Sequence, residues 1–412
     1  ADPAQFLLFD VPGPPAALRV EDEWRAGAAH VLYDKLVRDL DPDALLIGSL
    51  FEGGSDDTVV SVGDDDRSHT VATILYDLIP LLSPDEHLGS AGARRWYFGK
   101  VAEARRADVL LGISHSACAE GIEHFPSDNE HVHYVGAAAG EEFASTDYRA
   151  FRDHPLAEQV KTYHGITRPY LMHTSALDPR KNFEGLIAAF ARLPEALRRS
   201  HQLVLVCKLN PAGEAGLRRA IADAGLGEDE VVLTGYVEDD ELRILYANCD
   251  LFVFPSFHEG FGLPVLEAMW CGAPAVGSDV SSVPEVIGRA DAQFDPNDRD
   301  AMVAVMTHAL GDPRFRAELV RHGERHARSF CWDEVAARAV TSIEQALARR
   351  PARPHRPITA DQAVARIGAL ECWASPSDAD LLNTARALAH NEQLHWPRQA
   401  GGDWGIPKQA AL

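Results

Sequence analysis

The most informative segment of the chain is Asp250-Leu-Phe-Val-Phe-Pro-Ser-Phe-His-Glu-Gly-Phe-Gly-Leu-Pro-Val-Leu-Glu-Ala-Met269. It opens with an apolar run that ends at Pro255, which predicts a short buried strand. Two glycines then mark a loop, and Pro264 stands where the first turn of a helix is expected. In parallel α/β sheets, ligands bind beyond the carboxyl ends of the strands, where helix N-termini point free N–H groups outward. The segment therefore predicts a ligand-binding loop between a strand and a helix.

Two carboxylates accompany this loop. Glu259 lies within it, and Glu267 follows about one turn into the expected helix. Gly260 and Gly262 let the backbone approach a ligand without interference from a Cβ atom. The carboxylates can then accept hydrogen bonds from two parts of one polyol-containing ligand. Two other interpretations are a simple tight turn with solvated glutamates and a glycosidase pair. Glycosidase carboxylates face each other across a substrate, whereas these two share one strand, loop and helix.

Short apolar runs alternate with helical patterns on both sides of this segment. The expected strands are residues 44–47, 70–75, 109–113 and 131–135, then 170–174, 202–207, 231–234, 251–255 and 274–278. The expected helices include residues 23–40, 91–106, 182–192, 212–224, 239–247, 264–271, 283–287, 299–310, 313–329, 332–349, 360–370 and 377–390. Such alternation predicts an α/β fold with parallel sheets covered by helices on both faces.

A polar, irregular stretch near 145–165 divides the chain, so we expect two Rossmann-like domains that face a cleft. We place the first domain at 1–160 and the second at 161–335, followed by a crossover helix at 336–350. A proline-rich composition marks the start of the remainder, 351–412, as a linker, and one or two helical patterns follow it. The chain thus carries a helical C-terminal extension beyond its two expected domains.

Composition excludes several classes of protein. The 412 residues suit two domains and an appendage, and 39 basic against 62 acidic residues give a net charge of −23. Such an acidic chain does not attract nucleic acid through its overall field. We find no apolar run near the roughly 20 residues of a membrane span, and no signal peptide at the N-terminus. The six cysteines form no C-x-x-C pair, so neither a disulfide framework nor a zinc site is expected. We expect a cytoplasmic protein, and a place at the inner face of the membrane stays open.

Glu259 and Glu267, with seven residues between them, resemble the signature of retaining glycosyltransferases of family 4, which have the GT-B fold. The match covers about residues 40 to 345. Supporting segments are Asp178-Pro-Arg-Lys-Asn182, Gly235-Tyr-Val-Glu-Asp-Asp-Glu-Leu242, Gly272-Ala-Pro-Ala-Val276 and Val283-Pro-Glu285. In the first half, Ile74-Leu-Tyr-Asp-Leu-Ile-Pro80 and Ile113-Ser-His-Ser116 resemble a branch that contains bacterial O-antigen and other surface-polysaccharide mannosyltransferases. The signature is specific for the class and weak for the sugar.

The resemblance implies roles for the residues of the loop. Glu267 would hold the ribose hydroxyls of the nucleotide, and Glu259 would hold hydroxyls of the donor sugar. Backbone N–H groups of Phe261, Gly262 and Leu263, next to Gly260, would lie near the sugar and the diphosphate. Other binding positions that it implies are Tyr236 and Val237, which would line the pocket for the base.

Arg180 and Lys181, which follow an expected strand, would neutralise the diphosphate leaving group. The alternative is a solvated pair at a helix start, but cations at a helix N-terminus oppose the helix dipole, so an anionic ligand is the better explanation. Many relatives carry Gly-Arg where this chain has Ser175-Ala176, and their arginine serves the diphosphate. Lys208, after the next expected strand, either supplies the missing charge or is a surface lysine.

The first half departs from the family in two ways. Tyr76-Asp77 stands where relatives often carry His-Asp; these residues either contact sugar or acceptor at the cleft, or Asp77 caps the following turn. His115 and His258 are cleft candidates, but neither is assigned as a general base. GT-B chains normally open with a strand and a glycine-rich loop, whereas the strand-like residues 5–10 lead here into a proline-rich segment. We therefore expect an abbreviated first domain that lacks its opening strand and loop.

These observations predict a retaining, metal-independent hexosyltransferase that uses a nucleoside-diphosphate sugar, with GDP-mannose as the best guess. Its acceptor would be a glycan or lipid-linked glycan of surface-polysaccharide or lipopolysaccharide O-antigen biosynthesis. No cofactor, nucleic acid partner or transmembrane segment is expected, and Asp64-Asp-Asp66 is interpreted as a surface turn, not a metal site. The alternative is a catalytically weak nucleotide-sugar-binding module of a larger or split glycosyltransferase, whose further domains would be its partners. A GT-B epimerase or phosphorylase has no positive support.

Overall fold

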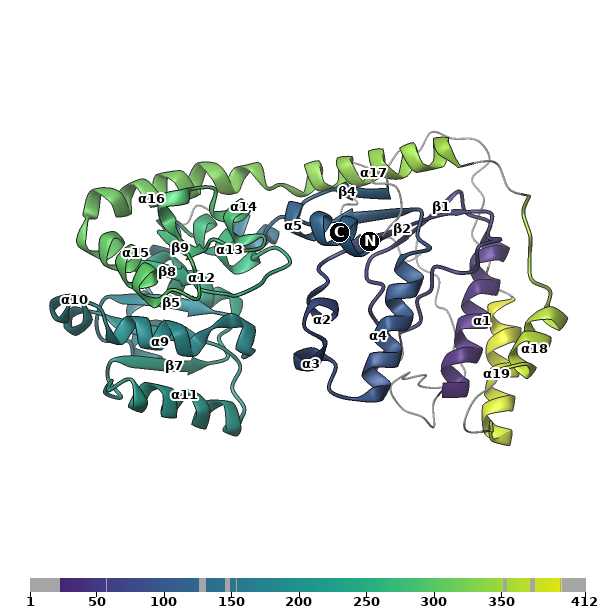
Figure 1. The fold of residues 1–412 in the computed structure, drawn as a ribbon, viewed down its shortest axis with the longest axis horizontal. Coiled ribbons are helices and arrows are strands. Elements are labelled where there is room, and N and C mark those ends of the chain that lie inside the picture. The colour runs from purple at the N-terminus through teal and green to yellow at the C-terminus, as the bar shows by residue number, and fades with distance from the viewer. Residues whose placement is uncertain are drawn as a thin grey trace.

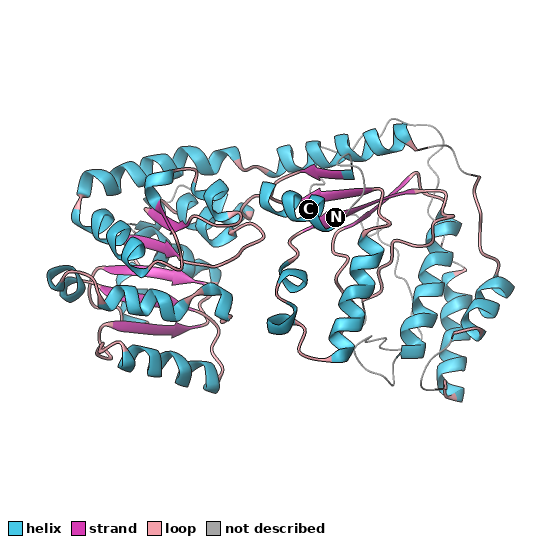
Figure 2. Cartoon of the chain, in the orientation of Figure 1, coloured by secondary structure: helices cyan, strands magenta, loops and turns pink. Residues whose placement is uncertain are grey.

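The computed structural model describes residues 23–56, 58–125, 131–144, 149–152, 154–350, 354–370, 375–392 and 394. These residues form two lobes, each built on a parallel sheet, with long helices running along one side of both (Figure 1). Colouring by secondary structure shows the strands of each sheet lying between helices (Figure 2). The expected class, two α/β domains with parallel sheets, is therefore confirmed.

The first sheet has four parallel strands in the order β1-β2-β3-β4. They are β1 (Ala44–Ile47), β2 (Thr70–Leu75), β3 (Val109–Gly112) and β4 (Val132–Tyr134). The helices of this lobe are α1 (Glu23–Leu40), α2 (Ile79–Leu82), α3 (Pro84–His87), α4 (Ala91–Ala104) and α5 (His115–His124). Because successive strands are also neighbours, the order does not reverse within the described part of this sheet. The strand expected at residues 5–10 lies outside the described residues.

The central strands of the first sheet, β2 and β3, are buried on both faces, which explains their mostly apolar sequences. Side chains alternate along a strand. Leu110 accordingly packs in the core that includes Tyr97 of α4, whereas Val109 and Leu111 belong to the core on the other face. That second core is completed by Val335, Ala339, Ile343 and Ala346 of α17 (Trp332–Arg349). The crossover helix therefore covers the first sheet, and its bounds are those expected for the helical pattern at 332–349, although the domain division placed its start at 336.

The second sheet has six parallel strands in the order β10-β9-β8-β5-β6-β7. They are β5 (Tyr170–Thr174), β6 (Gln202–Val206), β7 (Val231–Gly235), β8 (Leu251–Phe254), β9 (Ala275–Ser278) and β10 (Gln293–Phe294). The chain winds outward from β5 to β7, then returns to β8 and winds the other way. The order therefore reverses between β5 and β8, and such a switch point is where open α/β sheets bind ligands.

Helices surround this second sheet. They are α8 (Ala157–Tyr163), α9 (Phe183–Ala191), α10 (Glu195–Ser200), α11 (Pro211–Asp223), α12 (Asp239–Asn248), α13 (Leu263–Trp270), α14 (Val283–Ile287), α15 (Arg299–Gly311) and α16 (Pro313–His326). Shorter pieces are α6 (Glu141–Ala144), α7 (Arg149–Arg152) and the 3₁₀ turns η4 (Pro179–Lys181), η5 (Ala290–Ala292) and η6 (Ala327–Ser329). Helix α9 packs against α11 and α15, and α12 packs against α8 and α13. A single apolar core joins these helices to the strands.

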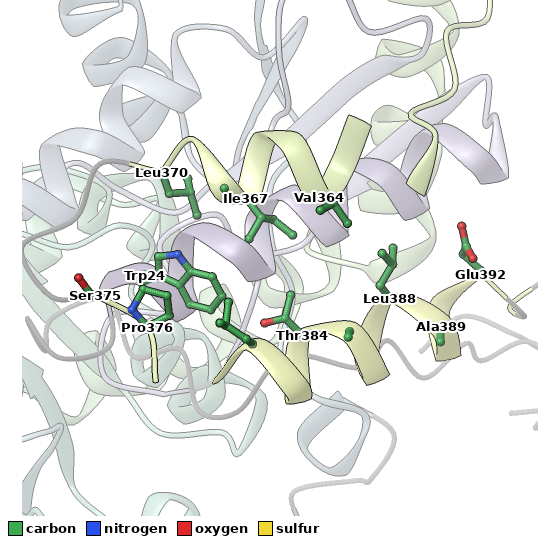
Figure 3. Close-up of a pocket in the computed structure, with 13 residues that line it drawn as sticks. Trp24, Val364, Ile367, Leu370, Ser375, Pro376, Thr384, Leu388, Ala389 and Glu392 are labelled. Atoms are coloured by element: carbon green, nitrogen blue, oxygen red, sulfur yellow. The ribbon is translucent and has the colours of Figure 1, made fainter. Parts of the chain in front are cut away.

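The C-terminal extension contains α18 (Ala360–Gly368) and α19 (Asp378–Asn391), which pack against α1. Trp24, Leu32 and Ile367 form part of their shared apolar core, and a pocket of about 490 Å³ opens beside Trp24 (Figure 3). The extension lies on the side of the first lobe that faces away from the second (Figure 1). None of the described helices is both long and apolar enough to cross a membrane.

Candidate active site

The loop after β5 is fixed to the end of β8 by polar contacts of its backbone and side chains. The Asp178 carboxylate accepts a hydrogen bond from Arg180 N at 2.8 Å and so caps η4. Asn182 has the left-handed φ of 57°, and its side-chain nitrogen donates to the carbonyls of Pro255 and Pro296 at 3.1 Å each. Phe257 N donates to Arg180 O at 2.9 Å. The basic residues that follow β5 are thereby held beside the loop that follows β8.

Glu259 receives both of these basic side chains. Its Oε2 lies 2.8 Å from Arg180 Nη1, and its Oε1 lies 2.6 Å from Lys181 Nζ. Arg180 Nη1 also donates to His258 O at 2.7 Å. Glu259 and Lys181 are buried, with 6% and 8% of their surfaces exposed. A buried carboxylate is tolerated when cations compensate its charge, and here two do so. The sequence predicted separate ligand contacts for these three residues; in the structure they bind one another.

The backbone of Glu259 is held from a third direction, the loop after β9. Glu259 N donates to Ser281 Oγ at 2.9 Å, and Ser282 Oγ donates to Glu259 O at 2.9 Å. Ser281 itself has a left-handed φ of 52°. Sequence reasoning missed both serines, because nothing in their local pattern distinguishes them from ordinary loop residues. Loops after three neighbouring strands, β5, β8 and β9, therefore converge on one carboxylate.

Gly260 is one of the points at which the two lobes meet. A Cβ atom there would lie 2.5 Å from Tyr76 O, closer than real Cβ atoms approach, and 3.0 Å from Asp77 Oδ2, which is tighter than most real contacts. The sequence analysis explained the glycine by the close approach of a ligand. In the structure, the group that approaches Gly260 closely is the backbone of the first lobe. Gly262, with φ of 101°, needs glycine for a different reason, since L side chains rarely adopt that conformation.

Of the two interpretations that the sequence left open for Asp77, the structure supports the capping of the following turn, and contact with sugar or acceptor stays a prediction. Its Oδ1 accepts from Ile79 N at 3.0 Å and closes the turn that leads into α2, while its Oδ2 faces Gly260 of the other lobe. Burial raises the pKa of Asp77, although the hydrogen bond from Ile79 and the charge of Arg180 favour the ionised form. Tyr76 is half exposed beside it. The first lobe therefore contributes a carboxylate to the edge of the Glu259 loop.

Glu267 lies on α13, separate from the basic pair. Its Oε2 accepts a hydrogen bond from Tyr246 Oη of α12 at 3.1 Å. Burial raises the pKa of Glu267 to about 7, and the carboxylates of Asp239 and Glu142 add to the rise. The sequence did not single out Tyr246, whose buried hydroxyl orients the carboxylate. Glu267 is thus placed on the helix that starts at the loop, as the spacing predicted.

The remaining predicted residues are less closely associated with this group. The Phe261 ring is buried against Phe330 at 5.6 Å between centroids, and Val237 is also buried, while Leu263 is exposed. Tyr236 is exposed after β7, with its hydroxyl 3.4 Å from the carboxylate of Glu238, and Lys208 is exposed after β6. No hydrogen bond or ion pair among the described residues joins Tyr236 or Lys208 to Glu259. The structure therefore brings together Arg180, Lys181, Glu259, Gly260 and Asp77.

Contacts between the lobes involve the two cleft candidates, His115 and His258, together with carboxylates that sequence reasoning did not assign. The Glu285 carboxylate of the second lobe accepts from His115 N and Ser116 N of the first, each at 2.8 Å. His258 Nε2 lies 2.7 Å from Glu120 Oε1. The segment with Glu285 was noted in the sequence, but its partner is 170 residues away and no local pattern could identify it.

The described residues contain no group of three or more His, Cys, Asp or Glu side chains that could hold a metal ion. The three aspartates at 64–66 lie in a surface turn, closed by a hydrogen bond from Arg67 N to Asp64 O at 3.2 Å. Asp66 there pairs with Arg38 at 2.6 Å.

Comparison with known proteins identifies relatives of this geometry. Residues 158–326 match the family described as glycosyl transferases group 1. The serotype-specific mannosyltransferase WbdA of Escherichia coli is 36% identical over 391 residues, which are 94% of this chain and 47% of that protein. The O-antigen chain mannosyltransferase B of Escherichia coli is 35% identical over 200 residues, 48% of this chain and 52% of that protein. The chain spans about half the length of these curated relatives.

A solved structure supports the fold. Alr3699/HepE from Anabaena, in complex with UDP and glucose, superposes with a TM-score of 0.59 at 18% identity, over 76% of this chain and 81% of that one. The likeness at this identity concerns the fold alone. Together with the two sheets and the helix that returns to the first lobe, it confirms the GT-B architecture.

Proposed function

Residues 158–326 are a group 1 glycosyl transferase domain, and on this premise we propose that the chain transfers a hexose from a nucleoside diphosphate to a glycan. The observation that carries the proposal is the convergence of Arg180 and Lys181 on Glu259 at the switch point of the second sheet. Asp77 of the first lobe reaches the same loop, so donor and acceptor groups can meet there. The reaction proceeds with retention and needs no metal ion or cofactor.

The donor diphosphate binds beside Arg180 and Lys181. As the bond between the sugar C1 and the diphosphate oxygen breaks, negative charge grows on the leaving group, and the two cations stabilise it. The acceptor hydroxyl attacks C1 from the same face, and the departing diphosphate takes its proton. Glu259 shares the cations before the donor arrives and then accepts hydrogen bonds from the sugar. N–H groups at the start of α13, where Gly262 and Leu263 lie, face the same charge.

Glu267 accepts hydrogen bonds from the ribose, with Tyr246 holding its carboxylate in place. Tyr236 and Val237 line the pocket of the base, and Lys208 adds positive charge near the diphosphate. Tyr76 and Asp77 contact the sugar or the acceptor from the first lobe. These assignments rest on the positions of the residues in the two lobes and on the resemblance of their motifs to the family.

The sugar is mannose, supplied by GDP-mannose, and the acceptor is a glycan or lipid-linked glycan of surface-polysaccharide biosynthesis. The two Escherichia coli relatives support this assignment, since both are named mannosyltransferases and one is named for the O-antigen chain. The reaction takes place in the cytoplasm, at or near the inner face of the membrane.

A panel of GDP-, UDP- and TDP-sugars tests the donor by thermal shift. A ligand at 100 times its Kd should stabilise the chain by about 2.7 kcal/mol. Transfer from GDP-mannose is then followed in EDTA, and the anomeric configuration of the product is read by NMR. Stabilisation by GDP-mannose, transfer in EDTA and an α-mannoside from the α-donor are expected. A dependence on Mn²⁺ that is lost in EDTA and restored by Mn²⁺ would mean that the diphosphate site is assigned wrongly.

The first sheet favours a second candidate, a nucleotide-sugar-binding module of a larger glycosyltransferase. Its described part has four strands that wind in one direction, without the reversal that creates a binding crevice in the second sheet. A module of this kind would bind GDP-mannose but neither transfer nor hydrolyse it. Turnover by the isolated chain excludes the module, and stabilisation without turnover favours it.

A further inference from the structure

Helix α5 of the first lobe is held by the second lobe at its N-terminus. Glu285 Oε2 accepts from His115 N and Glu285 Oε1 accepts from Ser116 N, both at 2.8 Å. Ser114 Oγ accepts from Ala117 N at 2.9 Å. Carboxylates are stabilised at helix N-termini by free N–H groups and by the helix dipole. The second lobe therefore fixes the position of α5 relative to its own loops.

Glu120, in the middle of α5, contacts both loops that build the candidate site. Its Oε2 accepts a hydrogen bond from Leu78 N at 2.9 Å, and its Oε1 lies 2.7 Å from His258 Nε2. Leu78 directly follows Asp77, and His258 directly precedes Glu259. Only 11% of the Glu120 side chain is exposed, against 28% for His258. One carboxylate thus joins a first-lobe loop to a second-lobe loop.

The contacts continue from Glu120 to the charged centre. The carbonyl of His258 accepts from Arg180 Nη1 at 2.7 Å, and the same nitrogen lies 2.8 Å from Glu259 Oε2. On the other side, the backbone that Glu120 holds at Leu78 is continuous with Tyr76–Asp77, against which Gly260 packs. Moving the Glu120 carboxylate would therefore move both Asp77 and the Arg180–Glu259 pair.

We propose that Glu120 is a positioning residue of the transfer reaction: by holding Leu78 N and His258 together, it sets the first-lobe and second-lobe loops in register. The inference rests on the proposed function and adds a residue to it. Within the described part of the chain, the polar partners of Glu120 are Leu78 and His258, neither of which is assigned to the nucleotide, so Glu120 acts on the alignment of the lobes and not on donor affinity. Because only 11% of the Glu120 side chain is exposed, its loss also leaves Leu78 N without an acceptor and lowers stability, whereas its effect on the rate is geometric. Misplacement by about 1 Å at a reacting centre costs roughly 100-fold in rate.

Two substitutions test the proposal, with Glu123→Ala as the matched control on the exposed side of the same helix. Glu120→Ala removes both contacts. Glu120→Gln keeps an oxygen that can accept from Leu78 N and a nitrogen that can donate to His258. We expect Glu120→Ala to lose about 10- to 100-fold in kcat. GDP affinity, measured by calorimetry, should stay within about twofold of the parent. Glu120→Gln should restore most of the lost rate, and Glu123→Ala should match the parent.

Hydrogen exchange followed by mass spectrometry gives a readout that needs no turnover. In Glu120→Ala, exchange in peptides covering residues 76–82 and 256–262 should accelerate about tenfold or more, because Leu78 N–H loses its acceptor and the second loop loses its anchor. Glu120→Gln and Glu123→Ala should leave both peptides unchanged. Absence of transfer by the parent would overturn the proposed function while exchange still tests the role of Glu120. Unchanged exchange, or a loss of GDP affinity as large as the loss of kcat, would overturn the inference.

Discussion

At the scale of single residues, Glu259 holds the two cations that the proposed reaction needs for its leaving group. Arg180 Nη1 and Lys181 Nζ each lie within 2.8 Å of one of its carboxylate oxygens. While this pairing lasts, a diphosphate meets cations whose charge is partly neutralised. Removing the carboxylate charge leaves both cations for the diphosphate, but it also leaves a buried lysine less well compensated, which is costly.

Glu259→Gln should therefore separate binding from catalysis. We expect GDP to bind at least as tightly as to the parent, because Arg180 and Lys181 no longer share their charge with a carboxylate. Turnover should fall about 100-fold or more, because the sugar loses a charged acceptor as its anomeric bond breaks. The melting temperature should also fall. Calorimetric titration with GDP and initial rates at saturating donor measure the first two effects.

Glu228→Gln, which removes an exposed carboxylate from the same lobe, is the control for net charge and should change none of these quantities. If Glu259→Gln binds GDP clearly more weakly than the parent, the carboxylate does not compete with the diphosphate for the cations. If the variant retains its turnover, Glu259 has no role in the chemical step.

Glu267 gives the stability of the fold a dependence on pH. Its pKa is raised from 4.5 to about 7, mainly by burial, so at intermediate pH the folded chain retains a proton that the unfolded chain has lost. The stability that this proton contributes is full below about pH 4.5 and is lost as the pH rises through about 7, a change of about 3 kcal/mol. Glutamine does not titrate, so the free energy of unfolding of Glu267→Gln should not share the parent's loss. The difference between variant and parent should therefore shift in favour of the variant on going from pH 5 to pH 8. Urea denaturation at both values measures the difference; an equal difference at both would contradict the raised pKa.

Nucleotide binding should show the opposite dependence on pH. In the proposed function the ribose hydroxyls donate to the ionised Glu267, so the affinity of the parent for GDP should rise as the pH passes from 6 to 8. Glu267→Gln should bind GDP about 10- to 150-fold more weakly at pH 8, the cost of losing a charged acceptor, and the deficit should shrink at pH 6. The diphosphate of GDP also ionises in this range, and the dependence of GDP affinity on pH in Glu267→Gln corrects for that contribution. Equal affinity of parent and variant at pH 8 would remove Glu267 from the ribose site.

At the scale of elements, the loop between β8 and α13 is shaped as much by the first lobe as by its own strand. Gly260→Ala should disturb that fit, because the new Cβ atom would lie 2.5 Å from the backbone oxygen of Tyr76. The two loops must separate, so turnover should fall by about 10- to 100-fold. GDP affinity should change little, since the contacts assigned to the nucleotide lie in the second lobe. Gly216→Ala in α11 is the matched control: nothing lies within 4 Å of its added Cβ, and it should be neutral or stabilising by about 0.5–1 kcal/mol. Unchanged turnover in Gly260→Ala would show that the lobes are not in contact when the reaction occurs.

The same element shows why much of the fold could be predicted and part of the site could not. Strands buried on both faces, such as β8, have continuous apolar runs, and Pro264 marks the first turn of α13, so both were predicted within a residue or two. The basic pair and the glutamates could be found because each follows a strand and belongs to a motif. The pairing of Arg180 and Lys181 with Glu259 could not be predicted. The partners are separated by 79 and 78 positions in the sequence, and the loop geometry that joins them has no local signal.

At the scale of the whole molecule, the two lobes are joined by the chain and by a few polar contacts. Helix α17 starts beside the second lobe and buries one side against the first sheet, and Trp332 Nε1 donates to Ala139 O at 3.0 Å. Glu285 on α14 adds the contact with the N-terminus of α5. No periodicity or composition predicts such contacts, because they depend on how two separately folded units meet. The position of the lobes is therefore a property that single side chains can alter.

Glu285→Ala should loosen this arrangement. His115 N and Ser116 N lose their acceptor, and the loss of a capping group costs about 0.5–2 kcal/mol, which here falls on the contact between the lobes. We expect a larger radius of gyration in small-angle X-ray scattering, a lower kcat and nearly unchanged GDP affinity, because Glu285 contacts the first lobe and not the basic pair. Glu228→Ala removes the same charge from an exposed position of the second lobe and should scatter like the parent. Identical scattering by Glu285→Ala and the parent would mean that α17 alone sets the distance between the lobes. In that case the Glu285 carboxylate only caps α5, and the loss of rate should disappear as well.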